Sequence, residues 1–302
     1  MVTVAVAGGS GGLGLIIAHS ILDSKKHKVV VLSRKENPEL SALGVDVRPV
    51  DYNDLSSLIA ALNGVHTVIS TIAVPNKALA DSQIALINAA VAAGVKRFAP
   101  SEFTISSYDS IELYAPKTAV WDAVVASGLE YTRFTCGLFH NFWAAGTPKG
   151  EKEALAGMPA WNFIINVKAG TADIPGDGGV KIAVIDTRDV ARFVTASLDL
   201  PKWDEELGML GEYASWNELV DKAEKATGRK FLRRYTTRQE LVKLAEDPEK
   251  RFYNQFRIAM VDQKFTVPPT LNEKFPEIRP MSTQDFLDNA WAGVELPPPA
   301  WK

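Results

Sequence analysis

The chain has 302 residues, of which 46% are hydrophobic and 23% are charged. These shares are typical of a packed globular protein and exclude intrinsic disorder, collagen-like repeats and coiled coils. The 33 basic residues nearly balance the 36 acidic ones, so the chain lacks the basic field that attracts nucleic acids or anionic membranes. We therefore expect neither a nucleic acid nor a membrane as its partner.

A single cysteine, Cys136, cannot form an internal disulfide, and no cluster of cysteine and histidine predicts a metal site. The first residues carry no basic segment of the kind that opens a signal peptide. No apolar run approaches the roughly 18 residues that are needed to cross a bilayer. We therefore expect a cytoplasmic protein, either a monomer or a homodimer, that binds no metal.

The first half of the chain alternates short β-branched runs with stretches of helical periodicity. Strands are predicted at residues 2–7, 29–33, 45–50, 66–71, 95–100 and 129–134. Helices are predicted at residues 11–23, 55–62, 81–93 and 118–127. Buried strands that alternate with helices predict an α/β fold, with a doubly wound parallel sheet and helices on both of its faces.

The second half of the chain has a different composition. Residues 1–150 contain only 12 of the 33 basic and 12 of the 36 acidic residues, so residues 151–302 are nearly twice as charged. A strand leading into a helix is predicted over 180–201, an edge strand at 208–211, a helix at 217–226, and irregular or extended chain over 268–280 and the tail. We expect a sheet domain over 1–150 to which 180–211 returns, and a smaller region made of 151–179 and 212–302.

Three glycines, Gly8, Gly11 and Gly14, form G-x-x-G-x-x-G between the first strand and the first helix. In that context a dinucleotide pyrophosphate can approach bare backbone and lie at the helix N-terminus. Ser10 can offer its hydroxyl and amide to a phosphate, and Gly12 leaves room beside it. The alternative is a plain glycine-rich turn.

The end of the second strand selects between the two dinucleotides. Arg34 stands where it can pair with a 2′-phosphate, and Lys35 adds a second positive charge, so the sequence favours NADPH/NADP over NAD. If the strand ended two residues later, Glu36 would instead bind the ribose 2′-hydroxyl. Asp51, after the third strand, has the position of an adenine contact; its alternative role is a cap for the helix at 53–61.

Three segments carry a resemblance to a known family: VAVAGGSGGLG at 4–14, AGVKRFAPSEFT at 93–104 and PGDGGVKIAVIDTRDVA at 175–191. They resemble the isoflavone reductase-like and NmrA-like branch of the atypical short-chain dehydrogenases/reductases, which includes phenylcoumaran benzylic ether and pinoresinol-lariciresinol reductases. The resemblance implies an NADPH-binding Rossmann domain with a smaller C-terminal α+β substrate domain. The chain departs from this family at Gly12, where many relatives carry Tyr, and matches it weakly over about the last 100 residues.

The resemblance also implies further cofactor contacts. It places Ser101, Glu102 and Phe103 beside the cofactor, near the nicotinamide end. Leu13, Thr71 and Cys136 complete the set of residues that we expect at the cofactor. A nucleophilic role for Cys136 is rejected, because no histidine partner is evident and buried cysteines usually serve packing.

Lys117 is the candidate catalytic residue. Ordinary short-chain dehydrogenases use Tyr-x-x-x-Lys, and none of the seven tyrosines of this chain has a lysine four residues later. The resemblance implies instead that Lys117, at the start of the helix after Ser-Glu-Phe, contacts the cofactor and stabilises or protonates the oxyanion formed as hydride arrives. The alternative is a solvated lysine in a first helical turn.

A small aromatic substrate is expected at the carboxyl end of the sixth strand. Phe103, Phe139, His140 and Phe142 are the predicted substrate contacts, with His140 as a donor to a substrate oxygen. The aromatic residues at 138–143 are equally compatible with an ordinary core between domains. Taken together, the sequence predicts an NADPH-dependent reductase of an aromatic or phenolic metabolite; the alternative is a non-catalytic NmrA-like regulator that senses NADP(H). A sugar-nucleotide epimerase is disfavoured by the missing Tyr-x-x-x-Lys.

Overall fold

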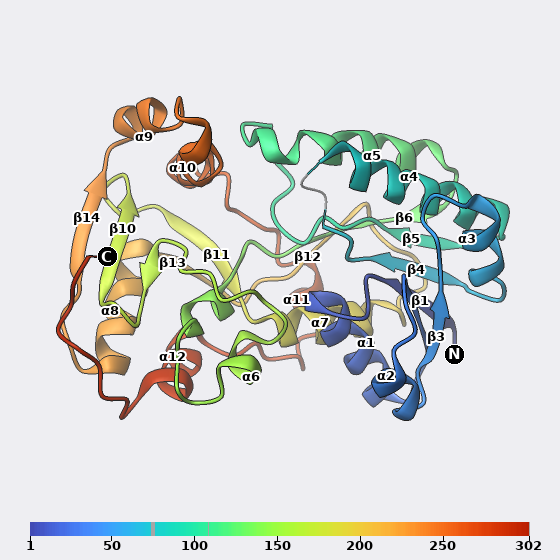
Figure 1. Cartoon of the computed structure of the whole chain (residues 1–302), viewed down its shortest axis with the longest axis horizontal. Coiled ribbons are helices and arrows are strands. Elements are labelled where there is room, and N and C mark those ends of the chain that lie inside the picture. The colour runs from blue at the N-terminus through green and yellow to red at the C-terminus, as the bar shows by residue number, and fades with distance from the viewer. Residues whose placement is uncertain (74–75, 108, 302) are drawn as a thin grey trace.

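The computed structural model describes residues 1–73, 76–107 and 109–301. Two lobes lie side by side along the long axis of the molecule, with the N-terminal sheet in one and most of the later residues in the other (Figure 1). Within the described residues, the first lobe contains a sheet of six strands in the order β3-β2-β1-β4-β5-β6. Every neighbouring pair in it is parallel, which confirms the predicted doubly wound sheet.

The elements of the first lobe follow the predicted alternation closely. Its strands are β1 Thr3–Ala7, β2 Lys28–Ser33, β3 Asp46–Pro49, β4 Thr67–Ser70, β5 Arg97–Ala99 and β6 Glu130–Tyr131. Its helices are α1 Gly12–Ser24, α2 Pro38–Ala42, α3 Leu55–Ala61, α4 Lys77–Ala92 and α5 Ala115–Ala126. The helix α2 was not predicted.

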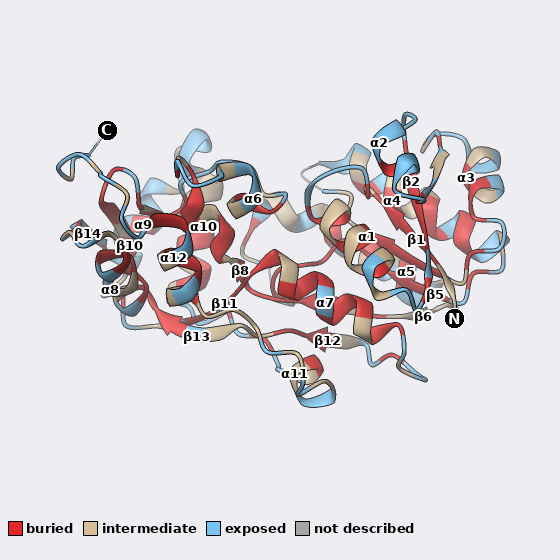
Figure 2. Ribbon diagram, turned by 90° about the horizontal axis from the view of Figure 1, so that it is seen from below, coloured by how far each residue is buried: buried red, intermediate tan, exposed pale blue. Residues whose placement is uncertain are grey.

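Alternate residues of the central strand enter different cores. Val4 and Val6 pack in one core with residues of α1 and α7, the helix Thr187–Ser197. Ala5 and Ala7 pack in the other core with residues of α3, α4 and α5. Since both faces of the sheet are covered, its central strands β1, β4 and β5 are almost wholly buried, as Figure 2 shows for β1 and β5.

The second lobe carries most of the remaining elements. Its strands include β8 Leu138–Phe139, β9 Ile165–Asn166, β10 Thr171–Pro175, β11 Lys181–Ile185, β13 Glu212–Ser215 and β14 Leu232–Thr236, arranged as β14-β10-β9 and β13-β11-β8. Its helices and 3-10 helices are η1 Glu112–Tyr114, η2 His140–Ala144, α6 Glu151–Leu155, α8 Trp216–Thr227, α9 Arg238–Leu244, α10 Pro248–Val261 and α12 Thr283–Trp291. The short helix α11 Thr270–Lys274 packs instead in the core of the first lobe through Leu271. Buried aromatic side chains, including Trp143, Trp216 and Trp291, form its core.

Three sequence predictions are wrong in detail. The strand expected at 129–134 is broken after Tyr131, because the next residues, β7 Arg133–Thr135, pair with β12 Glu206–Gly208 rather than with β5. The edge strand expected at 208–211 is not formed: Gly208 is the last residue of β12, and residues 209–211 connect β12 to β13. Gly211 lies there because a side chain would collide with the backbone of Val184. The segment 268–280, expected to be irregular, contains the short helix α11.

The segment 180–211 contributes to both lobes. β11 pairs with β8 and β13, and its Ile182 and Val184 belong to the core of the second lobe. α7 packs with α1 in the core of the first lobe. The boundary expected near residue 150 stays a prediction. Along the described part of the chain, no helix has the length and apolar content that crossing a bilayer requires.

The glycine loop generates the first testable prediction. Gly14 lies so close to Thr71 and to the backbone of Gly8 that an added Cβ would stand 2.6 Å from the Gly8 carbonyl oxygen. Although alanine normally favours helices, Gly14→Ala should therefore lower the free energy of unfolding, by about 1–3 kcal/mol as for overpacked cores. Gly11→Ala is the control, since no atom lies within 4 Å of its added Cβ. Urea denaturation measures both, and equal midpoints for the two variants would contradict the prediction.

Candidate functional site

A cavity of about 550 Å³ opens at the carboxyl ends of β1, β2 and β4. This edge of a parallel sheet is where doubly wound folds bind ligands. Six of the predicted cofactor residues line it together: Gly8, Ser10, Gly11, Arg34, Asp51 and Thr71. Loops that are far apart in the sequence therefore meet at one groove, which we call the dinucleotide groove.

The glycine loop has the geometry that a phosphate needs. Gly8 has φ +81°, a conformation that favours glycine. Gly11 stands at the N-cap of α1 without a side-chain hydrogen bond, so the first amides of that helix are not capped by this residue. Thr71 donates from Oγ1 to the Ala7 carbonyl oxygen at 2.9 Å, and it thereby fixes the end of β1 against β4.

The end of β2 presents Arg34 to the groove. The strand ends at Ser33, so the condition under which Glu36 would bind the ribose is not met. Arg34 is exposed and lines the dinucleotide groove, whereas Lys35 and Glu36 are exposed and are not among its lining residues. The contact expected for Lys35 stays a prediction that its position does not favour.

Asp51 also lines the groove, and its alternative role is wrong. The N-cap of α3 is Asp54, whose side chain accepts a hydrogen bond from the Ser56 amide. Asp51 accepts instead from the Asn53 amide at 2.9 Å, within the loop. Its neighbour Tyr52, which sequence analysis missed, lines the groove as well; burial raises the pKa of Tyr52 to about 12. The aromatic residue directly after Asp51 in the sequence could have indicated this contact with the groove.

Lys117 is buried and held against the segment after β5. It lies in the first turn of α5 with 6% of its surface exposed. Its ammonium donates to the carbonyl oxygens of Ser101 and Glu102, the latter at 3.1 Å, and lies 5.2 Å from the ring centroid of Tyr114. The interpretation of a solvated lysine is therefore wrong. Burial lowers the pKa of Lys117, and the negative charge of Glu102 opposes this shift.

The predicted cofactor residues Cys136, Phe103 and Leu13 are also buried. Cys136 is fully buried, and burial raises the pKa of its thiol although the charge of Lys117 opposes that shift. A protonated thiol agrees with a packing role. Phe103 has φ +28° and stacks on Phe134 with ring centroids 5.7 Å apart. Leu13 is buried in the core beneath the glycine loop.

An aromatic chain links Lys117 to the predicted substrate residues. Tyr114, beside Lys117, contacts Phe252 of α10, with ring centroids 6.4 Å apart. Phe252 stacks on Trp161 at 6.3 Å, and Trp161 contacts Phe142 at 5.6 Å. Phe142 in turn lies 6.5 Å from Phe139. Sequence analysis missed Trp161 and Phe252, because nothing local connects them to the nucleotide motifs.

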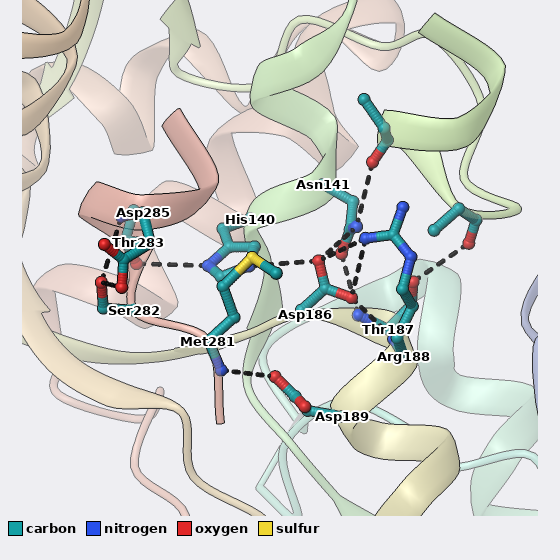
Figure 3. A network of polar contacts seen from close by, with 12 residues as sticks. His140, Asn141, Asp186, Thr187, Arg188, Asp189, Met281, Ser282, Thr283 and Asp285 are labelled. Atoms are coloured by element: carbon teal, nitrogen blue, oxygen red, sulfur yellow. Dashed lines mark hydrogen bonds and ion pairs between the residues drawn. The ribbon is translucent and has the colours of Figure 1, made fainter. Parts of the chain in front are cut away.

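His140 lies in a different environment from the one expected. Its Nδ1 is 3.2 Å from Thr283 Oγ1, and its Nε2 is 3.5 Å from Asp186 Oδ2 (Figure 3). The ring is buried and stacks on Phe286, with centroids 4.5 Å apart. Both ring nitrogens face protein groups, so the expected substrate contact of His140 stays a prediction that its surroundings do not favour.

Asp186 is the centre of a buried polar network that joins the lobes (Figure 3). Its carboxylate caps α7 through the Arg188 amide at 2.7 Å, pairs with the Arg188 guanidinium at 3.1 Å and accepts from Asn141 at 2.9 Å. Burial favours the neutral acid, but His140 and Arg188 outweigh it and hold the pKa of Asp186 below its usual range. In the sequence, the motif around residue 186 carries only the family resemblance, and it does not predict the role of Asp186 in this network.

Comparison with known proteins places this geometry in a family. The model of the NmrA-like family matches residues 2–287. The chain belongs to the NmrA-like family. It is 36% identical to the oxidoreductase BOA1 of Botryotinia fuckeliana, over 76% of this chain and 78% of that protein. It is 26% identical to the phenylcoumaran benzylic ether reductase TP7 of Nicotiana tabacum, over 94% of this chain and 96% of that one.

The NmrA-like fold is shared with solved reductases. The structure of AtPrR2 with NADP+ and (+)pinoresinol superposes with a TM-score of 0.75, at 21% identity, over 95% of this chain and 98% of that chain. The predictions of the family, of the fold class and of an oxidoreductase of the isoflavone reductase type are confirmed at the level of the family. The individual site residues stay predictions.

The Asp186 network of this NmrA-like protein gives a pH-dependent prediction. Asp186→Asn keeps the size and a capping oxygen but removes the charge, so the free energy of unfolding at neutral pH should fall by about 1–3 kcal/mol. The folded pKa is lowered, so the stabilisation is fully present above the usual carboxyl pKa and is lost as the pH falls through the folded pKa. The stabilities of the parent and the variant should therefore begin to converge below about pH 4 and become equal only below the folded pKa. Urea denaturation across acidic pH tests this.

The control for Asp186→Asn is Asp122→Asn, which alters an exposed carboxylate on α5. This variant should keep the parent's stability at every pH. A constant difference between Asp186→Asn and the parent down to the lowest pH would contradict the assigned charge.

Proposed function

We propose that this protein is an NADPH-dependent reductase of a small aromatic or phenolic metabolite, with Lys117 as the catalytic acid or electrostatic catalyst. The observation that carries the proposal is the burial of the Lys117 ammonium against Ser101 and Glu102, on the segment that follows β5. A desolvated cation beside the carboxyl edge of the sheet is suited to stabilise negative charge that develops on a substrate oxygen.

The residues of the dinucleotide groove fit NADPH. The uncapped start of α1 offers amides to a pyrophosphate, and Arg34 offers a planar cation to a 2′-phosphate. Asp51, Tyr52 and Thr71 line the groove, and Asp51 and Tyr52 are the proposed contacts of adenine and its ribose. Ser101 and Phe103, on the segment after β5, are the proposed contacts near the nicotinamide end. NADPH, when bound, supplies a hydride from C4 of the nicotinamide.

Lys117 can act on a substrate oxygen because of its remaining hydrogen-bonding capacity. An ammonium has three donors, and the two carbonyl oxygens of Ser101 and Glu102 accept from two of them. Burial also lowers the pKa of Lys117, which brings proton release closer to neutral pH. The same side chain can therefore hold a proton at Nζ, donate it to an oxyanion, and recover it from solvent after turnover.

The aromatic chain supports an aromatic substrate. Trp161 is 37% exposed and is packed edge-on against Phe142 and stacked on Phe252, so a flat apolar surface remains available near Tyr114. The neighbour AtPrR2, solved with (+)pinoresinol, binds an aromatic molecule of this kind. We add Trp161 and Phe252 to Phe103, Phe139 and Phe142 as the proposed substrate contacts.

The second candidate is a regulator that binds NADP(H) without turnover. The burial of Lys117 also favours the regulator, since a lysine with only 6% of its surface exposed is poorly accessible to a substrate. NADPH consumption, measured with the purified protein across phenolic ethers, quinones and enones, separates the two. Turnover supports the reductase; tight NADPH binding without turnover on any of these classes supports the regulator.

The same proposal includes a cytoplasmic location and a monomeric or homodimeric state. It also divides the chain into a nucleotide domain over 1–150 with 180–211, and a substrate region over 151–179 and 212–302. The buried single cysteine and the packing of α7 on α1 support the location and the division, respectively.

Cofactor selection is tested at Arg34. Loss of a charge-assisted contact to phosphate costs about 1.5–3 kcal/mol, so Arg34→Ala should weaken NADPH binding more than tenfold and leave NADH binding nearly unchanged. Lys35→Ala is the matched control, because Lys35 carries the same charge but is not a lining residue of the groove. Isothermal titration measures both dinucleotides. Equal losses for NADPH and NADH in Arg34→Ala would contradict the assignment.

Catalysis is tested at Lys117. If the ammonium stabilises charge that exists only in the transition state, Lys117→Met should lower the turnover rate by about 10²–10³ while NADPH affinity stays near the parent value. Methionine fills the buried site without a charge. Lys96→Met removes an exposed ammonium and should keep full turnover. The measurements are NADPH fluorescence and initial rates, and a Lys117→Met variant with the parent rate would exclude Lys117 from the mechanism.

A further inference from the structure

The segment of residues 153–158, which we call the brace, touches the glycine loop from the other lobe. It begins within α6 and ends at Met158. The backbones of Gly157 and Gly12 approach so closely that a Cβ added to Gly157 would stand 2.5 Å from the Gly12 carbonyl oxygen and 2.7 Å from its carbonyl carbon. Only a residue without a side chain permits this approach.

The brace is held in place by side chains of the Asp186 network. Its carbonyl oxygens accept three hydrogen bonds: Ala156 from Thr187 Oγ1 at 3.0 Å, Ala154 from Asn141 Nδ2 at 3.2 Å, and Glu153 from the Arg188 guanidinium. Asn141 and Thr187 are fully buried, and Asn141 Oδ1 accepts from the Thr187 amide at 2.9 Å (Figure 3). Each anchor of the brace is therefore itself fixed by a second contact.

The contact point on the glycine loop is at the start of α1. Gly12 is the first residue of that helix and has φ +54°, so the loop turns in a conformation that most residues avoid. A glycine with a positive φ can adopt many other backbone conformations of similar energy. A free loop that contains it therefore loses conformational entropy when it binds a ligand. A backbone packed against the Gly12 carbonyl removes some of those alternatives before any ligand arrives.

We propose that the brace preorganises the glycine loop for a dinucleotide pyrophosphate, and that Gly157 is a positioning residue for that part of the cofactor. The inference rests on the proposed function for the identity of the ligand. It assigns to the second lobe a share in cofactor binding through Gly157, which Thr187 and Arg188 of α7 help to hold in place. Unlike Arg34, the brace acts on the pyrophosphate, which NADPH and NADH share.

The test compares two glycines with the same backbone strain and different surroundings. Gly157 has φ +84° and contacts Gly12, whereas Gly94 has φ +75° and no atom within 4 Å of an added Cβ. If the brace is docked in about a tenth of Gly157→Ala molecules, the dissociation constants of NADPH and NADH both rise roughly tenfold. Adenosine 2′-monophosphate, which lacks the pyrophosphate, should keep its parent affinity. Gly94→Ala should bind all three like the parent.

Several outcomes would overturn the proposed role of the brace. Parent-like affinity for NADPH and NADH in Gly157→Ala is one, and a loss confined to NADPH is another, because it would point to the 2′-phosphate. An equal loss for adenosine 2′-monophosphate would show general damage to the groove rather than a pyrophosphate effect. These results leave the proposed function intact, whereas a parent protein that binds neither dinucleotide would refute that function first.

A second variant keeps the inference testable if Gly157→Ala does not fold. Thr187→Val preserves shape and removes the hydrogen bond to the Ala156 carbonyl oxygen. It should raise the dissociation constants of NADPH and NADH by one common factor, smaller than that of Gly157→Ala, with adenosine 2′-monophosphate again unaffected. Unchanged affinity for both dinucleotides in Thr187→Val would overturn the brace.

Discussion

The close approach of backbones at the end of β1 is the constraint on which the rest of the structure depends. β1 is buried on both faces, so its chain leaves the sheet through a space that α1 and β4 already fill. Gly8 and Gly14 fit there because neither carries a side chain that would collide with Thr71. The same absence of side chains exposes the backbone amides at the start of α1, so one packing requirement produces both a tight sheet edge and the place where we propose that a pyrophosphate binds.

Burial determines the protonation of the side chains beside this edge of the sheet. Lys117, Tyr114 and Cys136 lie close together, and removal from water changes each of them in the direction that disfavours charge. The tyrosine and the cysteine therefore stay protonated, and Lys117 is the group whose proton becomes easier to release. Two backbone carbonyl oxygens keep the ammonium oriented, as a preorganised cation requires. None of the seven tyrosines of this chain has a lysine four residues later, so the proposed catalyst acts without the tyrosine partner of ordinary short-chain dehydrogenases.

The two lobes meet through polar contacts as well as through apolar packing. Asp186 caps α7 of the first lobe, and through His140 it reaches Thr283 of α12 in the second. A buried carboxylate is costly unless its oxygens are paired, and here Asn141, Arg188 and His140 share that task. Because Asn141 and His140 come from η2 whereas Arg188 belongs to α7 itself, a shift of one lobe would leave the buried carboxylate with Arg188 alone. The network thus fixes the register in which the brace meets the glycine loop.

Local patterns in the sequence determined the nucleotide half of this protein. The glycine spacing, the strand–helix alternation and Arg34 directly after β2 are properties of short segments, and each segment needs only its own residues to take its form. Only the tertiary structure decided that Lys117 is buried, that the strand at 129–134 divides between two sheets, and that Trp161 and Phe252 join the aromatic chain. His140, predicted from the sequence as a substrate contact, lies against Asp186 in the tertiary structure. Burial and strand pairing depend on contacts between residues far apart in the chain. A local sequence pattern therefore does not indicate which distant side chain will pack against a given residue.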